Sequence, residues 1–162
     1  MSVHIDDVGA VSIREVAEKV QIEGTESEYD NWGEYAAEAR SMELRRWVIE
    51  VDTGSEVFAA GDMSSHWVWY GPSPGSKSAN IGIAIGSAWR GKGIGGIAQR
   101  LLAEQLHSEG IHRVEASTDV TNIPEQRALA KAGFVLEGVI RGAQMRADGR
   151  HDIQGWSHLP GD

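Results

Sequence analysis

The chain has 162 residues, of which 41% are hydrophobic, so it can form one ordinary domain with its own core and is too apolar for a disordered chain. Its net charge is −9 at pH 7, and no segment has the basic surplus that nucleic-acid binding requires. It contains no cysteine, which excludes disulfides and thiolate zinc sites.

The sequence shows neither a membrane segment nor a targeting signal. Its apolar runs all fall well short of the ~20 residues that a membrane-spanning helix needs. Residues 1–7 are acidic and lack the apolar core of a signal peptide. We therefore expect a cytoplasmic protein without a membrane partner.

The acidic charge is concentrated in the first half of the chain. Residues 1–76 contain 15 acidic and 5 basic residues, whereas residues 77–162 contain 9 acidic and 10 basic ones. This asymmetry is compatible with a solvated acidic face that aids solubility. It is equally compatible with an acidic half that meets a cationic partner and a near-neutral half that holds an anionic one.

Hydrophobic periodicity predicts the elements of the first half. Residues 11–16 alternate like a strand, and residues 17–44 have the loosely helical spacing of one or two helices. A hairpin follows, with strands at residues 46–51 and 56–61 around a tight turn. Its second strand continues at residues 67–70 through a bulge.

The second half has a clearer pattern. Three strands are predicted at residues 79–85, 113–118 and 134–140, and a last one at residues 152–157. A helix begins at Ile94, where apolar residues follow i, i+3, i+4, i+7 spacing, and ends at Gly110. A second helix begins at Pro124 and ends at Gly133. The order β, α, β, β, β, α, β, α, β, β predicts an α/β (α+β) protein, with a mixed sheet flanked by helices.

A glycine-rich turn connects the strand at residues 79–85 to the first clear helix. The unpartnered N–H groups and the dipole of a helix N-terminus favour an anion. Glycines also let a phosphate approach the backbone closely. Four glycines and two cations make a pyrophosphate site a better interpretation than a plain turn; the turn runs Arg90-Gly91-Lys92-Gly93-Ile94-Gly95-Gly96.

Two well-known nucleotide motifs fit this turn poorly. Residues 91–96 satisfy the GxGxxG pattern of dinucleotide-binding proteins. However, residues 86–90 separate the turn from the preceding strand, and the 66 residues that follow are too few for a full dinucleotide domain. The Walker A pattern fails because no Gly-Lys-Ser/Thr closes the turn. A nicotinamide-dependent oxidoreductase is therefore disfavoured.

The same turn resembles the Arg/Gln-x-x-Gly-x-Gly/Ala signature of the GNAT superfamily of acyl-CoA N-acyltransferases. Its flanks are also similar to that family. Residues 81–85 resemble the fourth strand, residues 113–122 the fifth strand, and residues 128–138 the helix and Gly-Phe-x-x-x-Gly that follow. Arg141 and Asp152 resemble residues of the ribosomal-protein N-terminal acetyltransferase branch.

The resemblance implies a mostly antiparallel central sheet that splays between its fourth and fifth strands. Acetyl-CoA would enter the opening from one side as the cosubstrate, and an amine from the other. The glycine turn would bind the pyrophosphate, and Asn122 would contact the pantetheine arm. The backbone of the fourth strand would pair with the pantetheine amides at Ile83, Ala84 and Ile85.

The resemblance also implies the partners. The acceptor would be a primary amine, either a protein N-terminus or a small cationic amine. Separately, His151 and His158 lack convincing metal-ligand spacing, so no metal is expected. Family members often dimerise through their late strands, so a homodimer is compatible with the resemblance. A second function remains open, a CoA-binding sensor or interaction module without turnover, because Leu129 replaces the tyrosine that serves as an acid in many relatives.

Three carboxylates are candidates for the proton transfers that acetylation of an amine requires. Glu115 and Asp119 share one face of the fifth strand and are candidate bases, although for each residue alone a structural role is favoured: a solvated strand residue for Glu115 and a loop cap for Asp119. Glu125 is a candidate donor or acceptor. Its place in the first turn of a helix is also favoured by the helix dipole alone.

Overall fold

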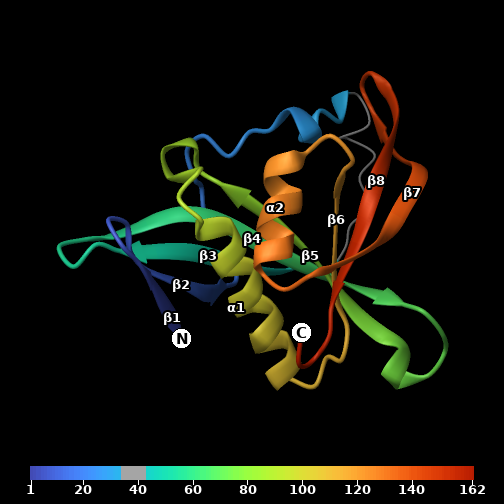
Figure 1. Ribbon diagram of the computed structural model, residues 1–162, viewed down its shortest axis with the longest axis horizontal. Coiled ribbons are helices and arrows are strands. Elements are labelled where there is room, and N and C mark those ends of the chain that lie inside the picture. Colours follow the sequence, from blue (N-terminus) through green and yellow to red (C-terminus); the bar gives the residue numbers. More distant parts are fainter. Residues whose placement is uncertain (34–42) are drawn as a thin grey trace.

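The computed structural model describes residues 1–33 and 43–162 (Figure 1). These residues form a sheet in the strand order β1-β2-β3-β4-β5-β6-β8-β7. Every neighbouring pair is antiparallel except β5 and β6, which are parallel. The strands are β1 (Ser2–Ile5), β2 (Gly9–Val16), β3 (Arg45–Asp52), β4 (Val57–Trp69), β5 (Lys77–Ile85), β6 (Val114–Asp119), β7 (Val135–Arg146) and β8 (Gly149–His158).

Two α-helices, α1 (Ile94–Ser108) and α2 (Ile123–Lys131), pack against each other over one face of the sheet (Figure 1). The apolar stripe of α1 is buried as its spacing predicts, with Leu102 and Leu106 fully inaccessible to solvent. These side chains join Trp47 of β3 in one hydrophobic core. The core thus fixes α1, and with it the glycine turn that precedes the helix, against the middle of the sheet.

The parallel strands β5 and β6 separate after a short contact. They pair at only three positions, where Ala79, Asn80 and Ile81 lie opposite residues 114–116. Beyond that point β5 continues along β4 to Ile85, and β6 continues along β8. The predicted mixed, mostly antiparallel sheet is confirmed, and its splay lies between β5 and β6.

The predicted strands and helices after residue 45 are found, most of them with small shifts at their ends, although β7 runs to Arg146, six residues beyond its predicted end. One detail differs in β4, which is a single continuous strand. Its register with β3 shifts where Ile49 faces Gly61 and Glu50 faces Ala59, so the bulge lies at Ala60, earlier than predicted. The short strand β1 was not predicted, because four residues show too little alternation.

The helices predicted in residues 17–44 are wrong for the part that the structure describes. Residues 17–33 contain no α-helix and form turns, extended chain and a single-turn 3-10 helix at Glu28–Asp30. Residues 34–42 of this prediction lie outside the described residues. Residues 17–33 are mostly polar and have no apolar stripe that could hold a helix against the sheet.

The buried stripe of α1 makes a prediction for stability. Replacement of Leu102 by alanine should lower the free energy of unfolding by about 2–5 kcal/mol, because it removes a fully buried side chain and leaves a cavity. Urea denaturation followed by circular dichroism measures the change. Glu104→Ala, on the exposed face of the same helix, is the control and should change it by only about 0.5 kcal/mol. Equal effects of the two variants would contradict this account of the core.

Candidate active site

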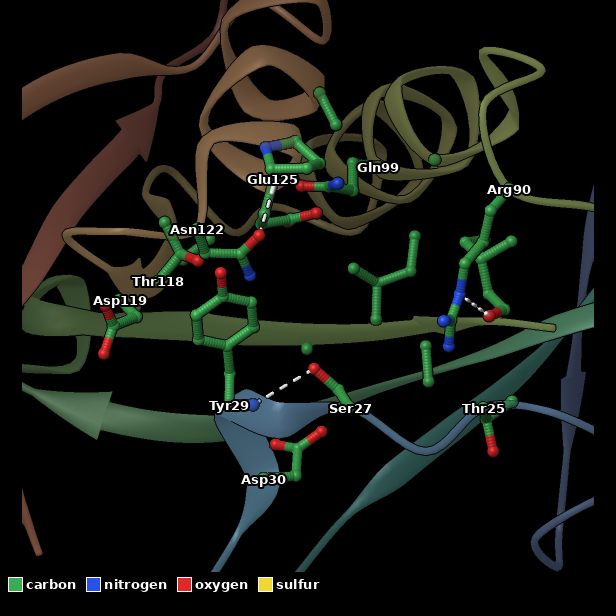
Figure 2. A pocket seen from close by; sticks show the side chains of 18 of the residues that line it. Thr25, Ser27, Tyr29, Asp30, Arg90, Gln99, Thr118, Asp119, Asn122 and Glu125 are labelled. Atoms are coloured by element: carbon green, nitrogen blue, oxygen red, sulfur yellow. Dashed lines mark hydrogen bonds between the residues drawn. The ribbon is translucent and has the colours of Figure 1, made fainter. Parts of the chain in front are cut away.

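A cavity of about 770 Å³ lies where β5 and β6 separate. The ends of these strands, the glycine turn and the first turns of α1 and α2 form its walls. Residues 24–30, which we call the strap, run along the remaining side. Figure 2 shows Ser27 and Tyr29 of the strap across the cavity from Gln99 of α1 and Glu125 of α2.

The glycine turn reaches the cavity in the conformation that an anion site needs. Gly91 and Gly93 have φ values of 74° and 80°, a left-handed geometry that favours glycine. A Cβ atom at either position would meet no other atom within 4 Å, so the turn is open to a ligand. Gly93 is the N-cap of α1, and the first turn of that helix contains no acidic residue. The positive end of α1 therefore faces the cavity without a negative charge of its own.

The end of β5 offers a free backbone edge to the same cavity. Residues 82–85 pair with β4 on one side, and the ladder with β6 has already ended on the other. Ile83, Ala84 and Ile85 all line the cavity. An extended ligand with amide groups can therefore pair with this edge as an added strand would.

Arg90 connects the turn to the strap. Its Nε donates to the carbonyl of Ile85 at 2.9 Å, and one terminal nitrogen donates to the carbonyls of Gly24 and Glu26 at 2.8 and 3.0 Å. Three backbone carbonyl oxygens thus accept hydrogen bonds from the guanidinium group that the sequence predicted to bind an anion. Arg90 lines the cavity and adds positive charge there, but its hydrogen bonds position the strap.

Lys92, the second predicted cation, lies beside Trp89, a residue of the cavity wall. Its ammonium group sits 5.0 Å from the centre of the Trp89 ring, and Lys92 itself is not part of the cavity wall. The backbone of the turn, at Gly91 and residues 93–96, forms the wall instead.

Glu125 and Asn122 lie together at the start of α2 and both line the cavity. The Asn122 side chain caps the helix by accepting a hydrogen bond from the backbone N–H of Glu125 at 3.3 Å. The Glu125 carboxyl points toward Gln99 of α1 (Figure 2). Burial raises the pKa of Glu125 to about 7, and the Gln99 amide partly offsets this rise. The carboxyl can therefore gain or lose a proton near neutral pH.

Asp119 lines the cavity, but other side chains already engage its carboxylate. Arg146 forms a buried ion pair with it at 2.8 Å, and the hydroxyl and backbone N–H of Thr121 donate to it. His151 Nδ1 lies 3.3 Å from the same carboxylate. Burial alone would raise the pKa of Asp119, but the Thr121 hydrogen bonds and the Arg146 charge outweigh it and lower the pKa. These contacts make Asp119 a weak base.

Glu115 is not part of the cavity wall. Its carboxylate accepts hydrogen bonds from the Tyr70 and Ser78 hydroxyls at 2.8 and 3.3 Å, and it pairs with Arg113 at 3.0 Å. Arg113 also binds Glu137 of β7. This network ties β6 to its neighbours, so the structure brings together Asp119, Glu125 and the turn but leaves Glu115 outside.

The family model of the acetyltransferase (GNAT) domain matches residues 3–135 of the chain. The chain belongs to the GNAT family. A relative described as a probable N-acetyltransferase, YjcK of Bacillus subtilis, is 39% identical over 66 residues, which are 40% of this chain and 36% of that protein.

Solved structures of other GNAT proteins share the fold. The ribosomal-protein-S5-alanine acetyltransferase of Vibrio fischeri has a TM-score of 0.61 at 20% identity, over 74% of this chain and 63% of its own. RimJ of Mycobacterium smegmatis, solved with a CoA disulfide, has a TM-score of 0.61 at 24% identity, over 72% and 53%. The microcin C7 self-immunity acetyltransferase MccE, solved with acetyl-CoA and AMP, has a TM-score of 0.59 at 26% identity, over 72% and 61%. The chain therefore spans less than two thirds of the length of these relatives.

Two further findings concern this GNAT chain within residues 1–33 and 43–162. No helix there has both the length and the apolar character that crossing a membrane would take. Nor do three or more histidine or acidic side chains gather there in a group that could hold a metal ion.

Several residues that line the cavity were not predicted from the sequence. Gln99 gave a usable signal, because it lies on the apolar stripe of α1, three residues before Leu102, and a polar residue in such a stripe needs a reason. Tyr29 and Arg146 gave no such signal in the sequence. They reach the cavity only through tertiary contacts, with the Arg146 guanidinium 5.9 Å from the centre of the Tyr29 ring.

The contacts of Arg90 predict how this GNAT chain holds its strap. Arg90→Met should speed amide hydrogen exchange at Tyr29 and Asp30 by about 10- to 100-fold, because two charged hydrogen bonds to the strap are lost. Hydrogen exchange measured by NMR would report this. Arg127→Met is the control, since Arg127 lines the same cavity from α2, and it should leave these rates unchanged. Unchanged exchange in Arg90→Met would show that Arg90 does not fasten the strap.

Proposed function

We propose that this GNAT chain transfers an acetyl group from acetyl-CoA to a primary amine. The free edge of β5 beside the open glycine turn carries the proposal, because together they offer backbone donors to a pyrophosphate and to an extended amide chain. The GNAT structures solved with CoA or acetyl-CoA support this choice of cosubstrate.

In this proposal the cosubstrate binds along the turn and then along β5. The N–H groups of Gly91 and residues 93–96 hold the pyrophosphate at the positive end of α1. Residues 83–85 pair with the pantetheine amides, and the Asn122 side chain contacts the end of that arm. Arg90 contributes its charge at this end of the cavity, and Lys92 adds a second positive charge beside Trp89 of the cavity wall.

The chemistry requires one bond to form and one to break. The amine nitrogen attacks the thioester carbonyl carbon, the C–S bond breaks, and the thiolate of CoA leaves. The incoming ammonium must lose one proton before the attack, and the nitrogen loses a second as the amide forms; one of the two protons passes to the thiolate and the other to water. We assign this exchange to Glu125, which lines the cavity and titrates near neutrality. Asp119 and Glu115, which other residues already hold, are assigned to the framework of β6.

The strap supports a cationic acceptor. Glu26, Glu28 and Asp30 are exposed side chains on the strap, and all three residues line the cavity opposite α2. Their combined negative charge would draw an ammonium group toward the opening. A protein N-terminus and a small cationic amine both satisfy this requirement. One of the similar solved structures is an acetyltransferase that modifies the N-terminal serine of a ribosomal protein, which supports a protein N-terminus as an acceptor.

Binding of acetyl-CoA by isothermal titration calorimetry is the first test. Gly93→Leu should weaken binding by at least about tenfold, because its side chain would fill the open space in front of the helix N-terminus. A leucine at φ 80° also strains the backbone by about 1–2 kcal/mol.

Gly110→Leu provides a matched control for that strain. Gly110 follows α1 at its other end, has a φ of 90°, and a Cβ atom added there would likewise meet no other atom within 4 Å. This variant should bind acetyl-CoA as the unaltered protein does. Equal affinity of all three proteins would place the cosubstrate elsewhere, and no binding to any of them would refute the proposed function.

The acidic strap makes a separate prediction about the acceptor. The acceptor KM should rise by roughly two- to tenfold between low salt and about 0.15 M, because salt screens the attraction of the exposed carboxylates. Steady-state rates of CoA release against a panel of amines would measure it. The triple variant with Glu26→Gln, Glu28→Gln and Asp30→Asn should show a higher KM at low salt and little further rise. A salt-independent KM would exclude steering by the strap.

A further inference from the structure

Gln99 is an unusual residue for the interior of α1. Its side chain is only 1% exposed, and neither the oxygen nor the nitrogen of its amide has a hydrogen-bond partner in residues 1–33 and 43–162. Buried polar groups are nearly always paired, because an unpaired one loses its hydration without compensation. A leucine at this position would fit the apolar stripe and avoid that loss. The amide therefore needs an explanation other than packing.

The location of Gln99 supplies one. It lines the cavity, and Figure 2 shows its amide beside the Glu125 carboxyl, which reaches it from α2. The two side chains lie close enough for the amide to favour the charged form of the carboxyl, yet they do not meet the geometry of a hydrogen bond.

The chemistry of the two groups is complementary in both protonation states of Glu125. A carboxylate only accepts hydrogen bonds, whereas a carboxylic acid also donates one. The glutamine amide contains one acceptor and one donor of nearly equal size, and half a turn about its last bond exchanges them. An apolar residue could serve neither state, and an acidic residue could serve both only by changing its own protonation.

We propose that Gln99 is a positioning residue that holds the Glu125 carboxyl in the cavity in both protonation states, accepting a hydrogen bond from the acid and donating one to the carboxylate. The inference rests on the proposed function, in which Glu125 exchanges a proton with the reacting groups. It assigns to Gln99 the task of keeping the carboxyl in one place while its charge changes.

Other charged or titratable groups face the same cavity. The strap contributes Glu26, Glu28, Tyr29 and Asp30, and the turn contributes Arg90. Asp119 of β6 and Arg146 of β7 neutralise each other in their ion pair. Arg127 and Lys131 lie on α2 itself. Burial is the main cause of the raised pKa of Glu125, and the Gln99 amide opposes it. Changes at Gln99 can therefore be measured without altering another charge.

Titration of the Glu125 side-chain carbon by NMR is the closing experiment, with the resonance assigned from the Glu125→Gln variant. Gln99→Met keeps the length of the side chain and removes both polar atoms. The Glu125 midpoint should then move to higher pH by about one unit, because the carboxylate loses a donor. The inflection of kcat with pH should move in the same direction, with a smaller change in the KM for acetyl-CoA.

Gln105→Met is the matched control. Gln105 lies on the same helix and donates to Glu109 at 3.1 Å, so its replacement removes an amide–carboxylate contact outside the cavity. It should leave the Glu125 midpoint unchanged. Identical midpoints in Gln99→Met and the unaltered protein would overturn the proposal, most clearly if Gln99→Met were also more stable to urea. That result would make Gln99 a purely structural residue.

The titration needs no turnover, so it separates this proposal from the proposed function. A shifted midpoint without CoA release against any amine would support the link between Gln99 and Glu125 while refuting acetyl transfer. Turnover with an unshifted midpoint would support acetyl transfer and refute the role of Gln99. If Gln99→Met does not fold, Gln99→Leu tests the same point, because it also removes both polar atoms and should move the Glu125 midpoint upward.

Discussion

The early separation of β5 and β6 is the constraint on which the rest of the structure depends. Three parallel residue pairs hold the two strands together, and each then follows its antiparallel neighbour, β4 or β8. The backbone of β5 past Ile81 is thereby left with a free edge, which in a continuous sheet would be covered. The glycine turn, α2 and the strap all border this opening, so the cavity is a consequence of the strand pairing.

The contacts of Arg90 show that a sequence motif can locate a turn without fixing what each of its side chains binds. The sequence signature correctly located an open turn at the start of α1, because glycines with positive φ and a helix N-terminus are local properties. The direction of a long side chain is set by the acceptors around it. For Arg90 the acceptors are carbonyls at the end of β5 and in the strap, which lies more than sixty residues earlier in the chain. The positive charge stays near the cavity, but its hydrogen bonds hold protein.

Periodicity sufficed for the elements that bury one face. The stripe of α1 and the alternation of β3 and β6 lead directly to buried side chains in one core. The same reasoning failed for residues 17–33, where scattered apolar residues suggested a helix. Distant groups hold this segment, including the Arg90 guanidinium and the Thr121 carbonyl, which accepts from the Tyr29 hydroxyl at 3.4 Å. No local pattern encodes such contacts.

Of the candidate site, only the features that depend on local sequence were predictable. The turn and the ends of β5 and β6 follow from local sequence, and so does the capping residue Asn122. Which of the three carboxylates can take part in proton transfer does not follow from local sequence. Glu115 and Asp119 share a strand face as alternation predicts, but their charged partners, Arg113 and Arg146, are set by the tertiary fold. Glu125, by contrast, has no cationic partner among the described residues, and this distinguishes it from the other two.

Burial of the Glu125 carboxyl lowers the stability of the folded protein near neutral pH, and this loss bears on the role of the residue. The first turn of a helix favours a carboxylate by about 0.3–1 kcal/mol, yet the pKa rises from 4.5 to about 7, which corresponds to about 3 kcal/mol. Desolvation thus outweighs the helix dipole. Because the folded state then binds more protons than the unfolded state between these values, the stability of the protein falls as the pH rises from 4.5 to 7. An alanine or serine at this position would avoid that loss, so a buried acid there is more readily understood as part of the chemistry than as part of the scaffold.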